Sequence, residues 1–306
     1  MCYFTRQNFF VVILLVFGIY TICESSQPAD GQQARQTKEQ MPANKHETEL
    51  FCPAQNGSED LQPPSLAVDP AAVDKNGCTA LMRASENGQA QNVQMLLESG
   101  ANPEAQLPAG LTSLILAAKE GHLEVVKLLL RHKANANAFV STPHSGVFTA
   151  LMYAIGSRKP SVIEALIEAG ADVNPPDMVG MTPLAMAISE THDLAIVKML
   201  LSKGADVNLR TYYGLTALMA TAGDENVNIL KTLLAAGANV NVQSDHGTTA
   251  LMIAAAEGRP EAVKALIAAG AYLQARNKSG ETALSLALRA GRKDNLAVLQ
   301  QASGKQ

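Results

Sequence analysis

Apolar and polar positions repeat along this chain with a nearly constant period. Seven regularly spaced Thr residues are each followed two residues later by a Leu, and they are Thr79, Thr112, Thr149, Thr182, Thr216, Thr249 and Thr282. Successive copies are 33, 37, 33, 34, 33 and 33 residues apart. A fixed period in this range predicts a solenoid of stacked units, in which each unit needs its neighbours to bury its apolar face.

Each period predicts a turn followed by two short helices. In the sixth copy a polar turn closed by Gly247 precedes Thr249, whose hydroxyl can cap a following helix. The second helix is expected to begin at Pro260, because proline is favoured at the first helical position. It is expected to end at Gly270, where glycine supplies a left-handed C-cap. Apolar residues recur at helical spacing between these points at Val263, Leu266 and Ile267.

These motifs resemble the ankyrin repeat, whose 33-residue unit is a β-turn plus two antiparallel helices. The Gly-x-Thr-x-Leu turn is present at 77–81, 110–114, 180–184, 214–218 and 280–284. The second-helix signature of that family stands at 121–130, and its Gly-Ala-Asp-Val-Asn ending at 170–174 and 204–208. The resemblance implies an all-α fold, an ankyrin-repeat solenoid of helix-turn-helix units with β-turn or hairpin fingers.

The repeats set the expected domain boundaries. They are expected to start near residues 74, 107, 140, 177, 211, 244 and 277. The apolar segment 66–73 is predicted to cap the first repeat, which gives a repeat domain over 66–306. The last repeat loses the Gly-Ala-Asp-Val-Asn ending, as expected for a terminal unit whose outer face meets water.

Two departures from the family pattern carry information. Where the family usually has His after the Leu, this chain has Met82, Ile115, Met152, Ala185, Met219, Met252 and Ser285. Such a stripe could be a soft binding surface, but its constant register favours packing in the core or between repeats. The third repeat also gains four residues around 140–148, which predicts one lengthened finger.

The N-terminus predicts export. Residues 1–8 carry one Arg and no acid, and residues 9–22 form an almost unbroken apolar run. Its 14 residues suit a secretory signal peptide and fall short of the ~20 needed to span a bilayer. Residues 1–23 are therefore interpreted as a cleaved signal peptide, and an uncleaved membrane anchor is the main alternative. The expected localisation is periplasmic or secreted.

Residues 24–65 predict a disordered linker, because their Gln, Ser, Pro and charged residues offer too little apolar surface to offset ordering entropy. Of the four cysteines, Cys2 and Cys23 lie in or beside the export signal. In an oxidising compartment Cys52 and Cys78 could pair, but spacing alone does not establish the pairing, and two unpaired thiols are the expectation. The pairing of these two residues stays open at this point.

Charge and composition favour a soluble interaction domain. Residues 74–306 hold 20 basic and 20 acidic side chains, whereas residues 1–73 hold 4 basic and 8 acidic ones. A balanced solenoid argues against nucleic acid as a partner. The six histidines do not approach cysteines or one another at metal-ligand spacing. No phosphate loop or nucleophile elbow is present, so we expect no enzyme activity, no cofactor and no metal.

Function is therefore expected to rest on the surface that the repeats present. In the ankyrin family, partner contacts usually come from finger tips and from the concave side of the array. The middle fingers carry apolar and aromatic residues, which are enriched in binding surfaces. The expected contact residues are Leu111, Phe148, Met178, Val179, Met181, Tyr212, Tyr213 and Leu215.

The expected function is that of an exported monomer that binds a partner protein without catalysis. The alternative is a membrane-anchored structural or regulatory scaffold, whose repeats organise an envelope or receptor complex.

Overall fold

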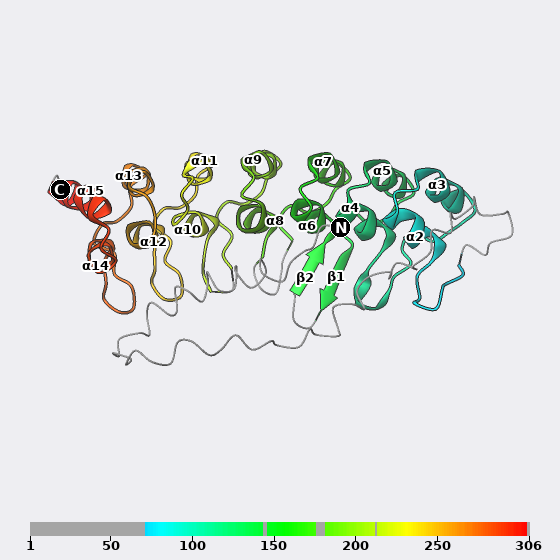
Figure 1. The fold of residues 1–306 in the computed structure, drawn as a ribbon, viewed down its shortest axis with the longest axis horizontal. Helices are drawn as coiled ribbons and strands as arrows, with labels where there is room; N and C mark the ends of the chain where they lie inside the picture. The colour runs from blue at the N-terminus through cyan, green and yellow to red at the C-terminus, as the bar shows by residue number, and fades with distance from the viewer. Residues whose placement is uncertain (1–70, 143–145, 176–180, 212, 305–306) are drawn as a thin grey trace, which may run out of the picture. The chain divides into compact units, whose positions relative to one another are not determined.

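In a computed structural model of the chain, the described residues form seven helix pairs that stack side by side (Figure 1). The structure describes residues 71–142, 146–175, 181–211 and 213–304. All of these described residues belong to one compact unit. One row of helices is formed by the first helix of each repeat and a second row by the second helix, with the fingers extending from one side (Figure 1).

The helix pairs follow the expected repeats in order. Repeats 1 to 3 contain α2 (Ala80–Glu86) with α3 (Ala90–Glu98), α4 (Ser113–Glu120) with α5 (Leu123–Arg131), and α6 (Ala150–Gly156) with α7 (Pro160–Glu168). Repeats 4 and 5 contain α8 (Pro183–Met186) and η3 (Ala187–Thr191) with α9 (Leu194–Ser202), and α10 (Ala217–Ala220) with α11 (Asn228–Ala235). Repeats 6 and 7 contain α12 (Ala250–Ala256) with α13 (Pro260–Ala268), and α14 (Ala283–Arg289) with α15 (Lys293–Ser303).

The repeated Thr begins every first helix of a pair. All seven Thr side chains accept a hydrogen bond from the backbone N–H three residues later, over 3.1 to 3.4 Å. This bond satisfies one of the N–H groups that a helix leaves without a partner at its N-terminus. Pro260 is the first residue of α13, and Gly270 has a φ of 88° just after that helix. The predicted capping pattern is therefore confirmed.

The stripe after the repeated Leu belongs to the core. Met82, Ile115, Met152, Met219 and Met252 are each 2% exposed or less. Because the same register is buried in successive repeats, these side chains pack where one repeat meets its neighbours. The interpretation of the stripe as packing residues is confirmed at these five positions, whereas Ala185 is partly buried and Ser285 in the last repeat is exposed.

A ladder of asparagines links the ends of successive repeats. The Nδ2 groups of Asn137, Asn174, Asn208 and Asn241 each donate to a glycine carbonyl of the next repeat, over 2.9 to 3.3 Å. The Oδ1 atom of each accepts from a backbone N–H two residues beyond that glycine, over 2.7 to 2.9 Å. These paired bonds hold each repeat in register with the next.

The four extra residues of repeat 3 form a longer finger, as predicted. Strand β1 (Phe139–Thr142) pairs antiparallel with β2 (Gly146–Thr149), with Val140 opposite Phe148. In three other fingers the described residues form only an isolated β-bridge, in which the repeated Thr is one partner, as between Gln106 and Thr112. The hairpin lies tightly against the preceding finger, because a Cβ on Gly110 would stand 2.5 Å from the Phe139 carbonyl oxygen. Glycine is required there both by this contact and by its φ of 94°.

Repeats 4 and 5 are less regular than the others. The first helix of repeat 4 changes from α-helix to the π-helical segment η3 after Met186. In repeat 5 the α-helical part, α10, is four residues long. The extra residue in the 34-residue step between Thr182 and Thr216 accounts for the wider π turn.

The two ends of the array also differ from its interior. At the C-terminal end Asn295 is 2% exposed, and its Nδ2 donates to the carbonyls of Ala254, Ala255 and Gly258 in repeat 6. At the other end Val73 is 61% exposed, and residues 66–70 of the predicted cap lie outside the described residues. Val73, which belongs to the predicted cap, is therefore not buried against the first repeat.

Cys78 corrects one expectation from the sequence. Its side chain is 2% exposed and disulfide-bonded, so the expectation of a free thiol at this position is wrong. No other cysteine falls among the described residues, and the partner therefore lies outside them. Sequence spacing could not predict this bond, because it does not say which thiols come close in space.

Candidate partner-binding surface

The fingers are built by a repeated turn before each Thr. In repeat 5 the Gly214 N–H donates to the Thr211 carbonyl over 2.8 Å, and the Thr211 N–H donates to the Leu215 carbonyl over 2.8 Å. Neighbouring fingers also contact one another, since the Asp245 N–H donates to the Tyr213 carbonyl over 3.1 Å. The fingers of repeats 5 and 6 are therefore joined through their backbones, which leaves side chains to form the outer surface.

Tyr213 is the best exposed of the predicted contact residues. It is 42% exposed, whereas Phe148, Met181 and Leu215 are partly buried. The ring of Phe148 lies 6.0 Å from that of Tyr153 on α6, which holds it against the array. The predicted contact residues Met178, Val179 and Tyr212 lie outside the described residues.

The prediction that Leu111 is a contact residue is wrong. It is 2% exposed, and the neighbouring Leu107 is 6% exposed. The finger of repeat 2 folds back through the short helix η2 (Pro108–Gly110), and the Leu107 N–H donates to the Leu111 carbonyl over 3.0 Å. Both leucines thus turn toward the core while only the turn between them stays at the surface. Leu111 is a packing residue and does not belong to the contact surface.

Phe139 is a surface residue that the sequence analysis missed. It lies on β1 opposite Thr149 and is 50% exposed. Because side chains alternate between the faces of a strand, Phe139 points away from the face shared by Val140 and Phe148. Val140 is 2% exposed, which identifies the inner face of the hairpin. Side chains alternate between the two faces of a strand. If the register of this hairpin had been known from the sequence, that alternation would have identified Phe139 as an exposed residue.

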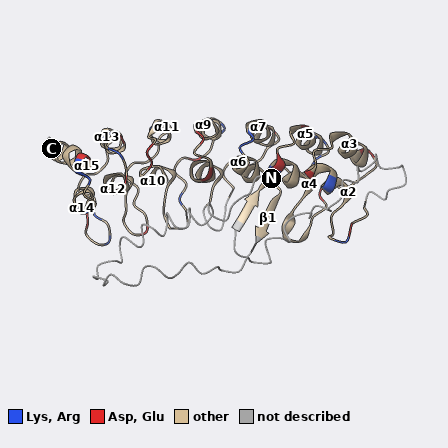
Figure 2. Ribbon diagram, viewed as in Figure 1, with Lys and Arg blue, Asp and Glu red and all other residues tan. Residues whose placement is uncertain are grey.

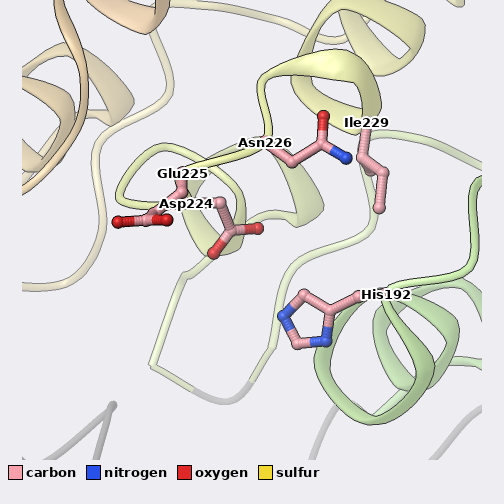
Figure 3. A pocket seen from close by; sticks show the side chains of 5 residues that line it. All are labelled: His192, Asp224, Glu225, Asn226 and Ile229. Atoms are coloured by element: carbon pink, nitrogen blue, oxygen red, sulfur yellow. The ribbon is translucent and has the colours of Figure 1, made fainter.

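A pocket opens between repeats 4 and 5, at the opposite ends of the first helices from the fingers. It is lined by His192, Asp224, Glu225, Asn226 and Ile229 and has a volume of about 270 Å³ (Figure 3). The His192 and Asp224 side chains extend toward the same space in the close view, and Ile229 comes from α11 (Figure 3). Ile229 is 3% exposed, so the pocket has one apolar wall and several polar groups.

His192 holds an unusual backbone conformation at this pocket. Its φ is 50°, in the left-handed region, and it ends the η3 segment. Gly88, Gly121 and Gly291 occupy the corresponding turn in three other repeats, each with positive φ. A non-glycine residue there costs stability, and the wider π turn of repeat 4 is what brings the imidazole to this place. The sequence analysis did not single out His192.

Two carboxylates near His192 are partly buried. Burial raises the pKa of Asp224, and the nearby His192 opposes that rise. Burial likewise raises the pKa of Glu190, again opposed by His192. Both groups therefore lie in surroundings that favour a neutral acid more than water does.

The described residues contain no arrangement of three or more His, Cys, Asp or Glu side chains that could hold a metal ion. Basic and acidic residues are distributed along the array (Figure 2). Among the helices that the structure describes, none is long and apolar enough to cross a membrane.

Comparison with family models agrees with this architecture. A model of three ankyrin repeats matches residues 101–177, 175–245 and 218–305, and a model of a single ankyrin repeat matches residues 76–106. The chain belongs to the ankyrin repeat family. Ankyrin repeats are protein–protein interaction scaffolds, and this is the coarse function that membership implies.

Curated ankyrin proteins match parts of this ankyrin array. Ankyrin repeat and SOCS box protein 6 of Homo sapiens is 39% identical over 82 residues, which are 26% of this chain and 20% of that protein. The B-cell lymphoma 3 protein homolog of Mus musculus is 30% identical over 160 residues, 52% of this chain and 28% of that protein. The chain thus spans well under a third of these relatives.

The fold of the ankyrin array is also found among solved structures. The crystal structure of the human ASB11 ankyrin repeat domain superposes with a TM-score of 0.61 at 26% identity, over 74% of this chain and 98% of that one. This likeness supports the all-α solenoid that the sequence predicted.

Proposed function

We propose that this chain is an exported ankyrin-repeat protein that binds a partner protein, without catalysis, through its finger tips and concave face. The observation that carries the proposal is the exposed aromatic surface of the middle fingers. Tyr213 is 42% exposed in repeat 5 and Phe139 is 50% exposed in repeat 3. Tyrosine and phenylalanine anchor many protein interfaces, because they bury a large area at low entropic cost.

Substitution of the finger residue tests the binding surface. Tyr213→Ser should weaken partner binding by about 2 kcal/mol, the scale of an interface hot spot, which is a roughly 30-fold rise in Kd. The fold should survive, because the Tyr213 ring is exposed. The hydrogen bond donated by the Asp245 N–H is accepted by the backbone carbonyl of residue 213, which the substitution leaves in place. Binding would be titrated by calorimetry with the partner recovered by pull-down from the native compartment.

Lys278→Ser is the matched control on the polar finger of repeat 7. Lys278 is exposed, and its backbone N–H donates to the His246 carbonyl over 2.9 Å. Glu281 of the same finger is unsuitable, since it accepts from Asn277 Nδ2 over 3.0 Å and pairs with Arg289. Equal loss of affinity in both variants, or none in Tyr213→Ser, would move the contact off the middle fingers.

Export is supported by two features at the N-terminal side of the array. Residues 9–22 form the apolar run that is typical of a signal peptide. Cys78 is disulfide-bonded, and disulfides persist mainly in oxidising compartments. We expect the mature chain to begin between Glu24 and Gln27, and mass spectrometry of the native protein measures this directly. An intact Met1 recovered from a membrane fraction would instead establish the anchored scaffold.

A further inference from the structure

We infer that the pocket between repeats 4 and 5 binds a lysine or arginine side chain of the protein partner. This inference rests on the proposed function and adds a chemical feature of the partner to it. The pocket residues follow the C-terminal ends of the first helices, whereas the fingers precede their N-termini. A partner that lies along the first helices of the middle repeats can therefore contact both the fingers and the pocket.

Other repeats show how a half-buried carboxylate near the end of the first helix is compensated. Glu86 ends α2 in repeat 1 and Glu257 follows α12 in repeat 6, and burial raises the pKa of both. Lys119 from repeat 2 lowers the pKa of Glu86, and Arg292 from repeat 7 lowers that of Glu257. In these repeats a permanent cation from the following repeat compensates a half-buried carboxylate.

Repeats 4 and 5 lack that compensation within the described residues. Glu190 and Asp224 each lie eight residues after the Thr of their repeat, as Glu257 does, and the side chain that lowers the pKa of both is His192. Glu225 is different, because Arg259 of repeat 6 pairs with it over 2.9 Å. Arg259 lies ten residues after its Thr, as Arg292 does, but this cation is bound by Glu225, while Asp224 borders the open pocket. A cationic side chain from outside would compensate Asp224 in the same way.

The shape of the pocket suits a single long side chain. Its volume of about 270 Å³ lies just below the range of roughly 300 to 1,000 Å³ usual for small-molecule sites. The buried Ile229 offers an apolar wall for the methylene stem of Lys or Arg. Asp224, and the side-chain carbonyl of Asn226, can then accept charge-assisted hydrogen bonds from the head group.

The test is a titration of the full-length chain with Nα-acetyl-arginine amide. Binding is monitored through the backbone amide chemical shifts in TROSY NMR spectra. Saturable shifts are expected at residues 190–193 and 224–229. The isosteric Nα-acetyl-citrulline amide carries no charge and should give no saturable shift. Asp224→Asn should weaken arginine binding at least fivefold, and Glu190→Gln should also weaken it.

Glu164→Gln on α7 is the control, because Glu164 is an exposed carboxylate outside the pocket. It should leave arginine binding unchanged. Equal shifts with the citrulline probe, or shifts spread over exposed acids along the array, would overturn the inference. So would full arginine affinity in both Asp224→Asn and Glu190→Gln.

The small probe keeps this inference separate from the proposed function. If the chain binds arginine amide in the pocket but no partner contacts the fingers, the proposed finger surface fails and the pocket remains. If Tyr213→Ser weakens the partner while Asp224→Asn leaves both the probe and the partner unaffected, the pocket fails and the finger surface remains.

Discussion

The asparagine ladder gives a quantitative test of how the repeats are joined. Asn241 of repeat 5 donates from Nδ2 to the Gly270 carbonyl over 3.1 Å and accepts at Oδ1 from the Tyr272 N–H over 2.9 Å. Asn241→Ala removes both bonds to repeat 6. Asn241→Asp keeps the acceptor for the Tyr272 N–H and loses the donor to Gly270.

The expected magnitudes follow from the bond count. A typical protein hydrogen bond contributes about 0.5 to 1.5 kcal/mol to stability. Asn241 is only partly buried, which places its two bonds toward the lower part of that range. Asn241→Ala should therefore cost about 1 to 2 kcal/mol, and Asn241→Asp about half as much. Gln274 is the matched control, since it holds the same register in repeat 6, is exposed and has no hydrogen bond to another described residue.

Urea unfolding measures the loss of stability, and amide hydrogen exchange locates it. Because repeats are coupled to their neighbours, the exchange of the Tyr272 N–H should accelerate in both Asn241 variants, more in Asn241→Ala. Gln274→Ala should leave the unfolding curve unchanged. The reasoning is refuted if Asn241→Ala unfolds like the parent chain, or if Asn241→Asp costs as much as Asn241→Ala.

Three further substitutions test the core, the turns and the half-buried carboxylates. Leu218 is 1% exposed, so Leu218→Ala should cost ~2 to 5 kcal/mol in a thermal melt, and an unchanged melt would remove it from the core. Lys133 has a φ of 66° at the position that Gly100 and Gly170 occupy in other repeats. Lys133→Gly relieves the strain of this left-handed conformation but increases the entropy of the unfolded chain, so the net gain in stability should be about 0.5 kcal/mol. Burial raises the pKa of Glu257 in the folded state, so folding favours the neutral carboxylic acid. The stabilisation from this neutral form is fully present below the ordinary glutamate pKa of about 4.3 and is lost as the pH rises through the pKa of the folded state. Glu257→Gln should therefore raise the melting temperature at pH 7 and change it little at pH 4, and the opposite order would contradict this sign.

The repeated fold could be predicted from sequence because its determinants are local. The Thr caps, Pro260 at a first helical position and Gly270 after a helix depend on neighbours within a few residues, and all three are found where expected. The lengthened finger of repeat 3 was predicted from the 37-residue step alone. Its register was not, because two strands with a four-residue insertion allow several pairings.

The candidate surface was predicted less well because exposure depends on contacts distant in sequence. Leu111 and Leu215 each directly precede the repeated Thr, yet Leu111 is fully buried and Leu215 only partly buried. The pocket at His192 depends on a π turn in repeat 4 and on the loop of repeat 5, about 30 residues later. The one sequence signal for it is the single extra residue in the 34-residue step.

The hairpin of repeat 3 shows that a finger can be lengthened without disturbing the stack. Thr149 still caps α6 through the Met152 N–H over 3.3 Å, as in the repeats with short fingers. Residues added between β1 and β2 therefore leave the spacing of α4, α6 and α8 unaffected. The position between β1 and β2 is a natural one for grafting a peptide epitope or a fluorescent label, with the ankyrin array serving as the display support.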